Sequence, residues 1–104
     1  AMAIHMAESP VGCMAALHTA AAAPDNFLTM EFHSIDIPWW KDIVRGLPEP
    51  LIEDGFIEVP AKPGLGIEAL NDEVIKAHLH PDIPGLWEPT DEWNDESAND
   101  RIWS

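Results

Sequence analysis

The sequence predicts an α/β fold that begins with a strand-helix-strand unit. Two short apolar segments, residues 3–5 and 27–31, end in His5 and Glu31, and a Pro-initiated, alanine-rich run lies between them. This order is typical of two parallel strands joined by a crossover helix. Because such strands need cover on both faces of their sheet, we expect the unit to be the end of a larger barrel of parallel strands, with its chemistry at the strand ends.

The connecting helix has clear signals at both ends. Ser9 can cap free amide groups, and Pro10 at the first helical position loses no hydrogen bond there. The helix is expected to stop at about Ala23, before Pro24. Its many small side chains would allow close packing against a sheet and neighbouring helices.

The second strand is predicted over residues 27–32, after a turn at residues 24–26. Side chains alternate between the two faces of a strand, so Glu31 and His33 should lie on the same face. A short helix is then expected to open at Pro38 and to end by Gly46.

The next segment differs in kind, because its signals are those of antiparallel structure. Asp54 and Gly55 lie between two apolar runs, residues 51–53 and 56–59, which predicts a two-residue hairpin. A helix of about nine residues is expected after Asn71. We expect the hairpin and this helix to lie apart from the opening unit.

Charge and composition limit the classes of partner. The 104 residues include 19 acidic and five Lys or Arg side chains, for a formal charge of −14, which disfavours nucleic acid and anionic membranes. The single cysteine, Cys13, can form no internal disulfide and is compatible with the cytoplasm, where we expect the protein. No apolar run reaches about 18 residues, and no basic segment opens the chain, so neither a membrane span nor a signal peptide is expected.

The chain resembles a known family over two runs, AIHMAESPVGCMAALHTAAAAPDNFLTMEFHSIDIPWW and LIEDGFIEVPAKPGLGIEALNDEVI. They are similar to the C-terminal portion of acid-sugar dehydratases in the mandelate racemase branch of the enolase superfamily, especially galactonate dehydratase-like members. The resemblance implies the C-terminal part of a modified TIM barrel, followed by a hairpin and helix that pack toward a separate capping domain. It divides the chain into the last two barrel strands with their helices (1–46), the segment returning to the capping domain (47–80), and an acidic, Trp-containing tail (81–104).

The resemblance also implies roles for individual residues. His5 would be an acid/base histidine at the end of the seventh barrel strand. Glu31, at the end of the eighth, would hydrogen-bond an enediolate formed from the substrate carboxylate. Glu31 can donate that bond only if burial raises its pKa. His33 is assigned to substrate binding from its position on the same strand face as Glu31 and not from the resemblance, and a packing or rim role is the alternative.

The resemblance implies Mg²⁺ as cofactor, with ligands on earlier strands outside this chain, so no metal ligand is assigned here. A metal such as zinc on His5, Glu31 and His33 is disfavoured, because their spacing resembles no compact metal motif. Expected partners are a sugar acid, a missing N-terminal barrel and capping domain or companion chain, and further copies of the complete enzyme in a homo-oligomer.

The sequence is compatible with two functions. In the first, the chain is the C-terminal portion of a Mg²⁺-dependent dehydratase acting on an aldonic or related sugar acid, inactive without the missing N-terminal part. In the second, it is a small acidic, non-catalytic protein-interaction domain.

Overall fold

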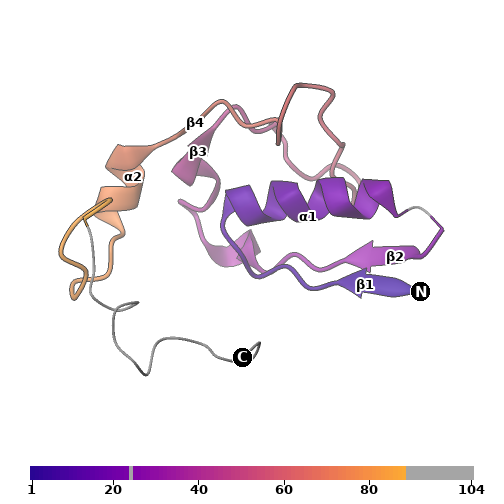
Figure 1. Ribbon diagram of the computed structural model, residues 1–104, viewed down its shortest axis with the longest axis horizontal. Helices are drawn as coiled ribbons and strands as arrows, with labels where there is room; N and C mark the ends of the chain where they lie inside the picture. Colours follow the sequence, from indigo (N-terminus) through magenta and orange to yellow (C-terminus); the bar gives the residue numbers. More distant parts are fainter. Residues whose placement is uncertain (24, 89–104) are drawn as a thin grey trace, which may run out of the picture.

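A computed structural model of the chain describes residues 1–23 and 25–88. Its first part is a strand-helix-strand unit: strand β1 (Met2–Ile4), helix α1 (Pro10–Ala22) and strand β2 (Phe27–Met30). The two strands pair in parallel, and α1 runs along one face of the pair (Figure 1). The predicted unit is confirmed, although the second strand ends two residues earlier than expected.

Helix α1 begins as its sequence predicts. The Ser9 hydroxyl accepts a hydrogen bond from the backbone N–H of Gly12 at 3.4 Å, and Pro10 occupies the first turn. The buried residues recur at helical spacing and form one face. They are Pro10, Cys13, Met14, Leu17 and Ala20.

The core lies between this helix face and the segment that follows β2. Met6, Cys13 and Trp40 form its buried centre. The indole N–H of Trp40 donates to the backbone oxygen of Glu8 at 2.9 Å, and its ring meets Phe32 edge-on with centroids 5.2 Å apart. Trp40 therefore ties the segment after β2 to the loop before α1.

The predicted helix from Pro38 to Gly46 is wrong. Two 3₁₀ turns, η1 (Ser34–Asp36) and η2 (Lys41–Ile43), are followed by strand β3 (Val44–Arg45). The apolar pattern of this segment reflects packing of Trp40 and Val44 into the interior rather than a helical stripe.

Strand β3 pairs antiparallel with β4 (Ala69–Leu70). Two further backbone bonds extend the pairing, from Glu68 N–H to Arg45 O and from Asn71 N–H to Ile43 O, each 2.8 Å long. These long-range partners satisfy backbone groups that a helix would have satisfied locally, which is why local propensity did not decide the outcome.

The turn at Asp54 and Gly55 is confirmed, with φ angles of 51° and 84°. The flanking strands are reduced to one antiparallel bridge between Glu53 and Phe56. Leu51 and Ile57 pack against the Met6, Cys13 and Trp40 cluster. The expectation that the hairpin lies apart from the opening unit is therefore wrong, because its apolar side chains complete the core.

Helix α2 (Asp72–Ala77) is shorter than the nine residues expected, and it lies away from the opening unit (Figure 1). It is attached through Trp39, whose ring stacks on His78 with centroids 3.9 Å apart and planes 12° apart. Most of the predicted acidic tail, including Trp93 and Trp103, lies outside the described residues. Among the helices that the structure describes, none combines the length and apolarity that crossing a membrane requires.

Large apolar side chains remain exposed around this small core. A cavity of about 480 Å³ is open between α1, β2 and residues 52–59, and its lining is mainly apolar. Leu28 is 69% exposed and Phe56 is 76% exposed, and both line it. Apolar surface of this kind marks a face suited to packing against other protein.

Candidate functional site

His5 and Glu31 are neighbours because β1 and β2 are in parallel register. Ile4 pairs with Met30, and the backbone N–H of Glu31 donates to Ile4 O at 2.9 Å. His5 and Glu31 directly follow these paired residues, so their side chains lie at the same end of the sheet. This is the carboxyl end, where parallel strands place functional residues.

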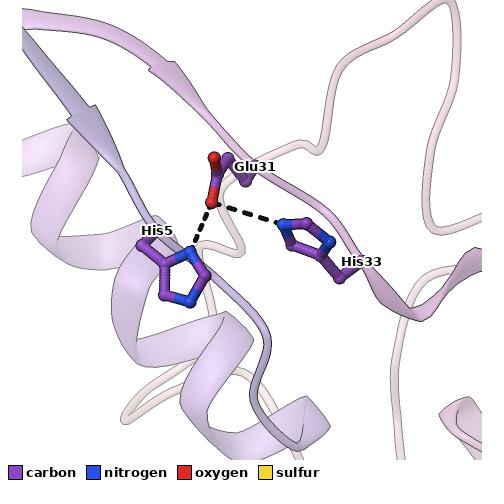
Figure 2. Close-up of polar contacts among 3 residues, drawn as sticks. All are labelled: His5, Glu31 and His33. Atoms are coloured by element: carbon purple, nitrogen blue, oxygen red, sulfur yellow. Dashed lines mark hydrogen bonds and ion pairs between the residues drawn. The ribbon is translucent and has the colours of Figure 1, made fainter.

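The Glu31 carboxylate lies between two imidazole rings (Figure 2). Its Oε2 atom is 2.5 Å from His5 Nδ1 and 3.4 Å from His33 Nε2. The two rings are tilted by 58°, with centroids 5.6 Å apart. The structure thus brings together all three residues that the sequence singled out.

The site is open to solvent. The side chains of His5, Glu31 and His33 are 76%, 48% and 56% exposed. The hydrogen bond from His5, followed by that from His33, lowers the pKa of the Glu31 carboxyl below its ordinary 4.5. Glu31 is therefore ionised at neutral pH.

A neutral, hydrogen-donating Glu31 is expected only where the complete barrel mouth buries the carboxylate, and in this chain the carboxylate is exposed and ionised. An ionised carboxylate only accepts hydrogen bonds, so the proton shared with His5 is donated by Nδ1–H. A carboxylate that accepts from one ring nitrogen fixes the tautomer of a neutral imidazole. Nε2 of His5 is then the nitrogen left to exchange a proton with another molecule.

Such a pair is suited to proton transfer. Imidazole titrates near neutral pH without a large perturbation, which matches the requirement for a general acid or base. If His5 Nε2 takes up a proton, the adjacent Glu31 carboxylate stabilises the resulting positive charge. The apolar cavity near β2 is separate from this pair, since none of the three site residues lines it.

The three side chains do not fit Mg²⁺. They supply two imidazole nitrogens and one carboxylate, whereas Mg²⁺ prefers an octahedral set of oxygen ligands. In the part of the chain that the structure describes, this is the one grouping of three His, Cys, Asp or Glu side chains close enough to share an ion.

Comparison with known proteins decides the family. Residues 1–74 match the family described as enolase C-terminal domain-like. The chain belongs to this family. The family predicted from the two sequence runs is confirmed, and the chain has the fold of part of the TIM-barrel-like, enolase C-terminal domain.

Two individual proteins are similar to this enolase-family chain. A D-xylonate dehydratase from Haloferax volcanii is 42% identical over 78 residues, which cover 75% of this chain and 18% of the relative. A mandelate racemase/muconate lactonizing enzyme-like protein from Rubrobacter xylanophilus, known from its crystal structure, is 44% identical with a TM-score of 0.68. That match covers 80% of this chain and 21% of the other. The chain thus spans a small part of the length of both.

Sequence reasoning identified the three residues and placed His5 and Glu31 side by side at the ends of two adjacent strands, but it did not identify the atoms that meet. Alternation predicted that Glu31 and His33 would share a face, and nothing local predicted that one carboxylate oxygen would lie within reach of both rings. The signal that could have revealed it is the strand register, which follows from the pairing of residues 26 positions apart.

Proposed function

We propose that the chain is the C-terminal portion of a dehydratase that removes water from an aldonic acid, with His5 as an acid/base residue. The observation that supports this most directly is the contact between His5 Nδ1 and Glu31 Oε2 at the carboxyl ends of two parallel strands. The similarity to a D-xylonate dehydratase supports a five-carbon aldonic acid as substrate.

The elimination of water in the proposed reaction needs two proton transfers. The C2–H bond of the substrate breaks, and its electrons form an enediolate with the adjacent carboxylate. The C3–O bond then breaks as the hydroxyl takes up a proton and leaves as water. The resulting enol gains a proton at C3 and loses its hydroxyl proton, which gives a 2-keto-3-deoxy acid. We assign one of these proton transfers to His5 Nε2 and the orientation of the His5 ring to Glu31.

The reaction also needs groups outside this chain. A hydrogen next to a carboxylate is very weakly acidic, so strong stabilisation of the new negative charge is required. We propose that Mg²⁺ supplies it when bound by carboxylates on other strands of the complete barrel. The exposed apolar residues around α1 and β2 support the same proposal, because further barrel elements would cover them.

On this proposal the 104 residues alone have no dehydratase activity, and the complete enzyme is a cytoplasmic homo-oligomer. His33 is proposed to contact substrate at the rim of the site, where its imidazole is 56% exposed. A sugar acid offers the hydroxyl and carboxylate groups that an imidazole can bind.

A chimera tests the function. The matched segment of the Haloferax D-xylonate dehydratase is replaced by the corresponding 78 residues of this chain, and formation of 2-keto-3-deoxy acid from D-xylonate is measured with Mg²⁺. We expect turnover by the chimera and none by the 104-residue chain. In the chimera, His5→Gln should lower kcat by about 10² to 10⁴, the usual contribution of general acid-base catalysis.

His80→Gln is the matched control, because His80 is also an exposed histidine beside a carboxylate, that of Asp82. The graft is extended through residue 82 so that it includes this pair. The His80→Gln substitution should then leave kcat unchanged. A folded, Mg²⁺-binding chimera in which His5→Gln retains full kcat would contradict the role of His5. Turnover by the 104-residue chain alone would contradict the need for other strands.

A further inference from the structure

We propose that His5, Glu31 and His33 form a binding site for a zinc-like divalent ion, separate from any Mg²⁺ site. The potential ligand atoms, one from each residue, all lie within 4.8 Å of one another. Zinc prefers imidazole nitrogen and carboxylate oxygen, and two histidines with one carboxylate form a common open zinc site. The geometry thus favours a metal that the sequence spacing had disfavoured.

One of the distances already suits a shared ion, and rotation of exposed side chains can adjust the others. Zinc bonds to nitrogen and oxygen are about 2.0–2.2 Å long, which places ligand atoms in a tetrahedral set about 3.4 Å apart. Glu31 Oε2 and His33 Nε2 already have a separation of 3.4 Å. His5 Nδ1 and Glu31 Oε2 are closer, at 2.5 Å, because they share a proton that the metal would replace.

The backbone supports the site without rearrangement. Glu31 and His33 lie two residues apart on one segment, and pairing of β1 with β2 holds His5 opposite them. The side chains project from this frame toward one another (Figure 2). Their exposure lets the His5 and Glu31 side chains separate by rotation about side-chain bonds, with no packed core to disrupt.

The site would be open rather than structural. Three protein ligands leave at least one position for water or another small ligand, as in catalytic zinc sites. Zinc bound at this site would inhibit the complete enzyme, because the metal would hold the His5 ring that must exchange protons. This consequence rests on the proposed function. Zinc binding itself can be measured without any turnover, so the two proposals fail separately.

Isothermal titration calorimetry of the full 104-residue chain with ZnCl₂ tests the site. We expect one site that persists in excess MgCl₂, because weak binding to the −14 charge of the chain would be displaced by another divalent ion. His33→Gln and Glu31→Gln should each weaken zinc binding more than about tenfold. Even a residue that only hydrogen-bonds to a metal ligand changes metal affinity by about tenfold or more.

His80→Gln is again the matched control. His80 Nδ1 lies 3.6 Å from Asp82 Oδ2, which gives an exposed histidine-carboxylate pair with only two potential ligands. This variant should bind zinc as the wild type does. Co²⁺ can replace zinc, and tetrahedrally bound Co²⁺ absorbs visible light. This absorption band should be lost in His33→Gln and kept in His80→Gln. Absence of zinc binding below millimolar concentration, or equal weakening by His80→Gln and His33→Gln, would overturn the proposal.

Discussion

The imidazole Nδ1 of His5 and the carboxylate Oε2 of Glu31 are 2.5 Å apart, although 26 positions separate the residues in the sequence. Each residue directly follows a strand, and the two strands are parallel neighbours whose last residues, Ile4 and Met30, are in register. The contact depends on backbone pairing as much as on side-chain chemistry. It explains why His5 and Glu31 should act as a unit.

The first prediction concerns this coupling. In the chimera, Glu31→Gln should lower kcat less than His5→Gln does, because the amide oxygen can still accept from Nδ1–H although the negative charge is lost. The double variant should be no slower than His5→Gln alone, since residues that act as a unit have non-additive effects. Steady-state kinetics of the three variants measures this. Multiplicative losses would show instead that the two residues act independently.

The second prediction concerns the buried indole of Trp40. Trp40→Phe keeps an aromatic ring in the core but removes the hydrogen bond to the Glu8 carbonyl, at a cost of about 0.5–1.5 kcal/mol. Trp39→Phe should cost less, because a phenyl ring can still stack on His78. Urea unfolding of the two variants, followed by fluorescence of the remaining tryptophans, compares the free energies. Equal losses of unfolding free energy in Trp40→Phe and Trp39→Phe would contradict a stabilising role for the hydrogen bond from Trp40 to Glu8.

The third prediction separates backbone strain from steric clash at two glycines. Gly55 and Gly66 have nearly the same φ, 84° and 83°. A Cβ at residue 55 would meet no atom within 4 Å, whereas one at residue 66 would lie 2.6 Å from the Pro60 ring. Gly55→Ala should therefore lower the free energy of unfolding by only about 1 kcal/mol, the penalty for alanine in a left-handed conformation. Gly66→Ala should lower it by more, because its Cβ would also clash. Urea unfolding of both variants measures the difference, and a larger loss for Gly55→Ala would contradict it.

The fourth prediction concerns pH and Cys13. Burial raises the pKa of this thiol above its ordinary 9.0, so the folded state favours the neutral form. In the unfolded chain the Cys13 thiol ionises near pH 9, so a further rise in pH shifts the folding equilibrium toward the unfolded state. The contribution of Cys13 to stability is thus complete below about pH 9 and is lost as pH rises toward the folded pKa.

Urea midpoints between pH 7 and pH 10.5 measure this effect. Cys13→Ala should be less stable at pH 7, because it leaves a space in the core, but should lose less stability as pH rises. Lys41 and other basic groups remain in both proteins, so the difference in slope isolates the thiol. Identical slopes would show that Cys13 ionises equally in the folded and unfolded states.

Much of this protein could be predicted from local sequence. Ser9 and Pro10 mark the start of α1 because a hydroxyl cap and a proline each satisfy the first helical turn without help from elsewhere. Asp54 and Gly55 fix a turn because the conformation depends on the residues themselves. His5, Glu31 and His33 could be selected as site residues from their types, their positions at apolar segment ends and the resemblance to a family.

Other features depended on partners distant in the sequence. Residues 44–45 became a strand because Ala69 and Leu70 supply an antiparallel partner, and local apolar spacing alone had indicated a helix. The lowered pKa of Glu31 follows from its hydrogen bonds with His5 and His33 rather than from its residue type. Local sequence therefore determined caps, turns and candidate residues, whereas strand pairing across 26 positions determined which atoms meet, because register is a property of two segments at once.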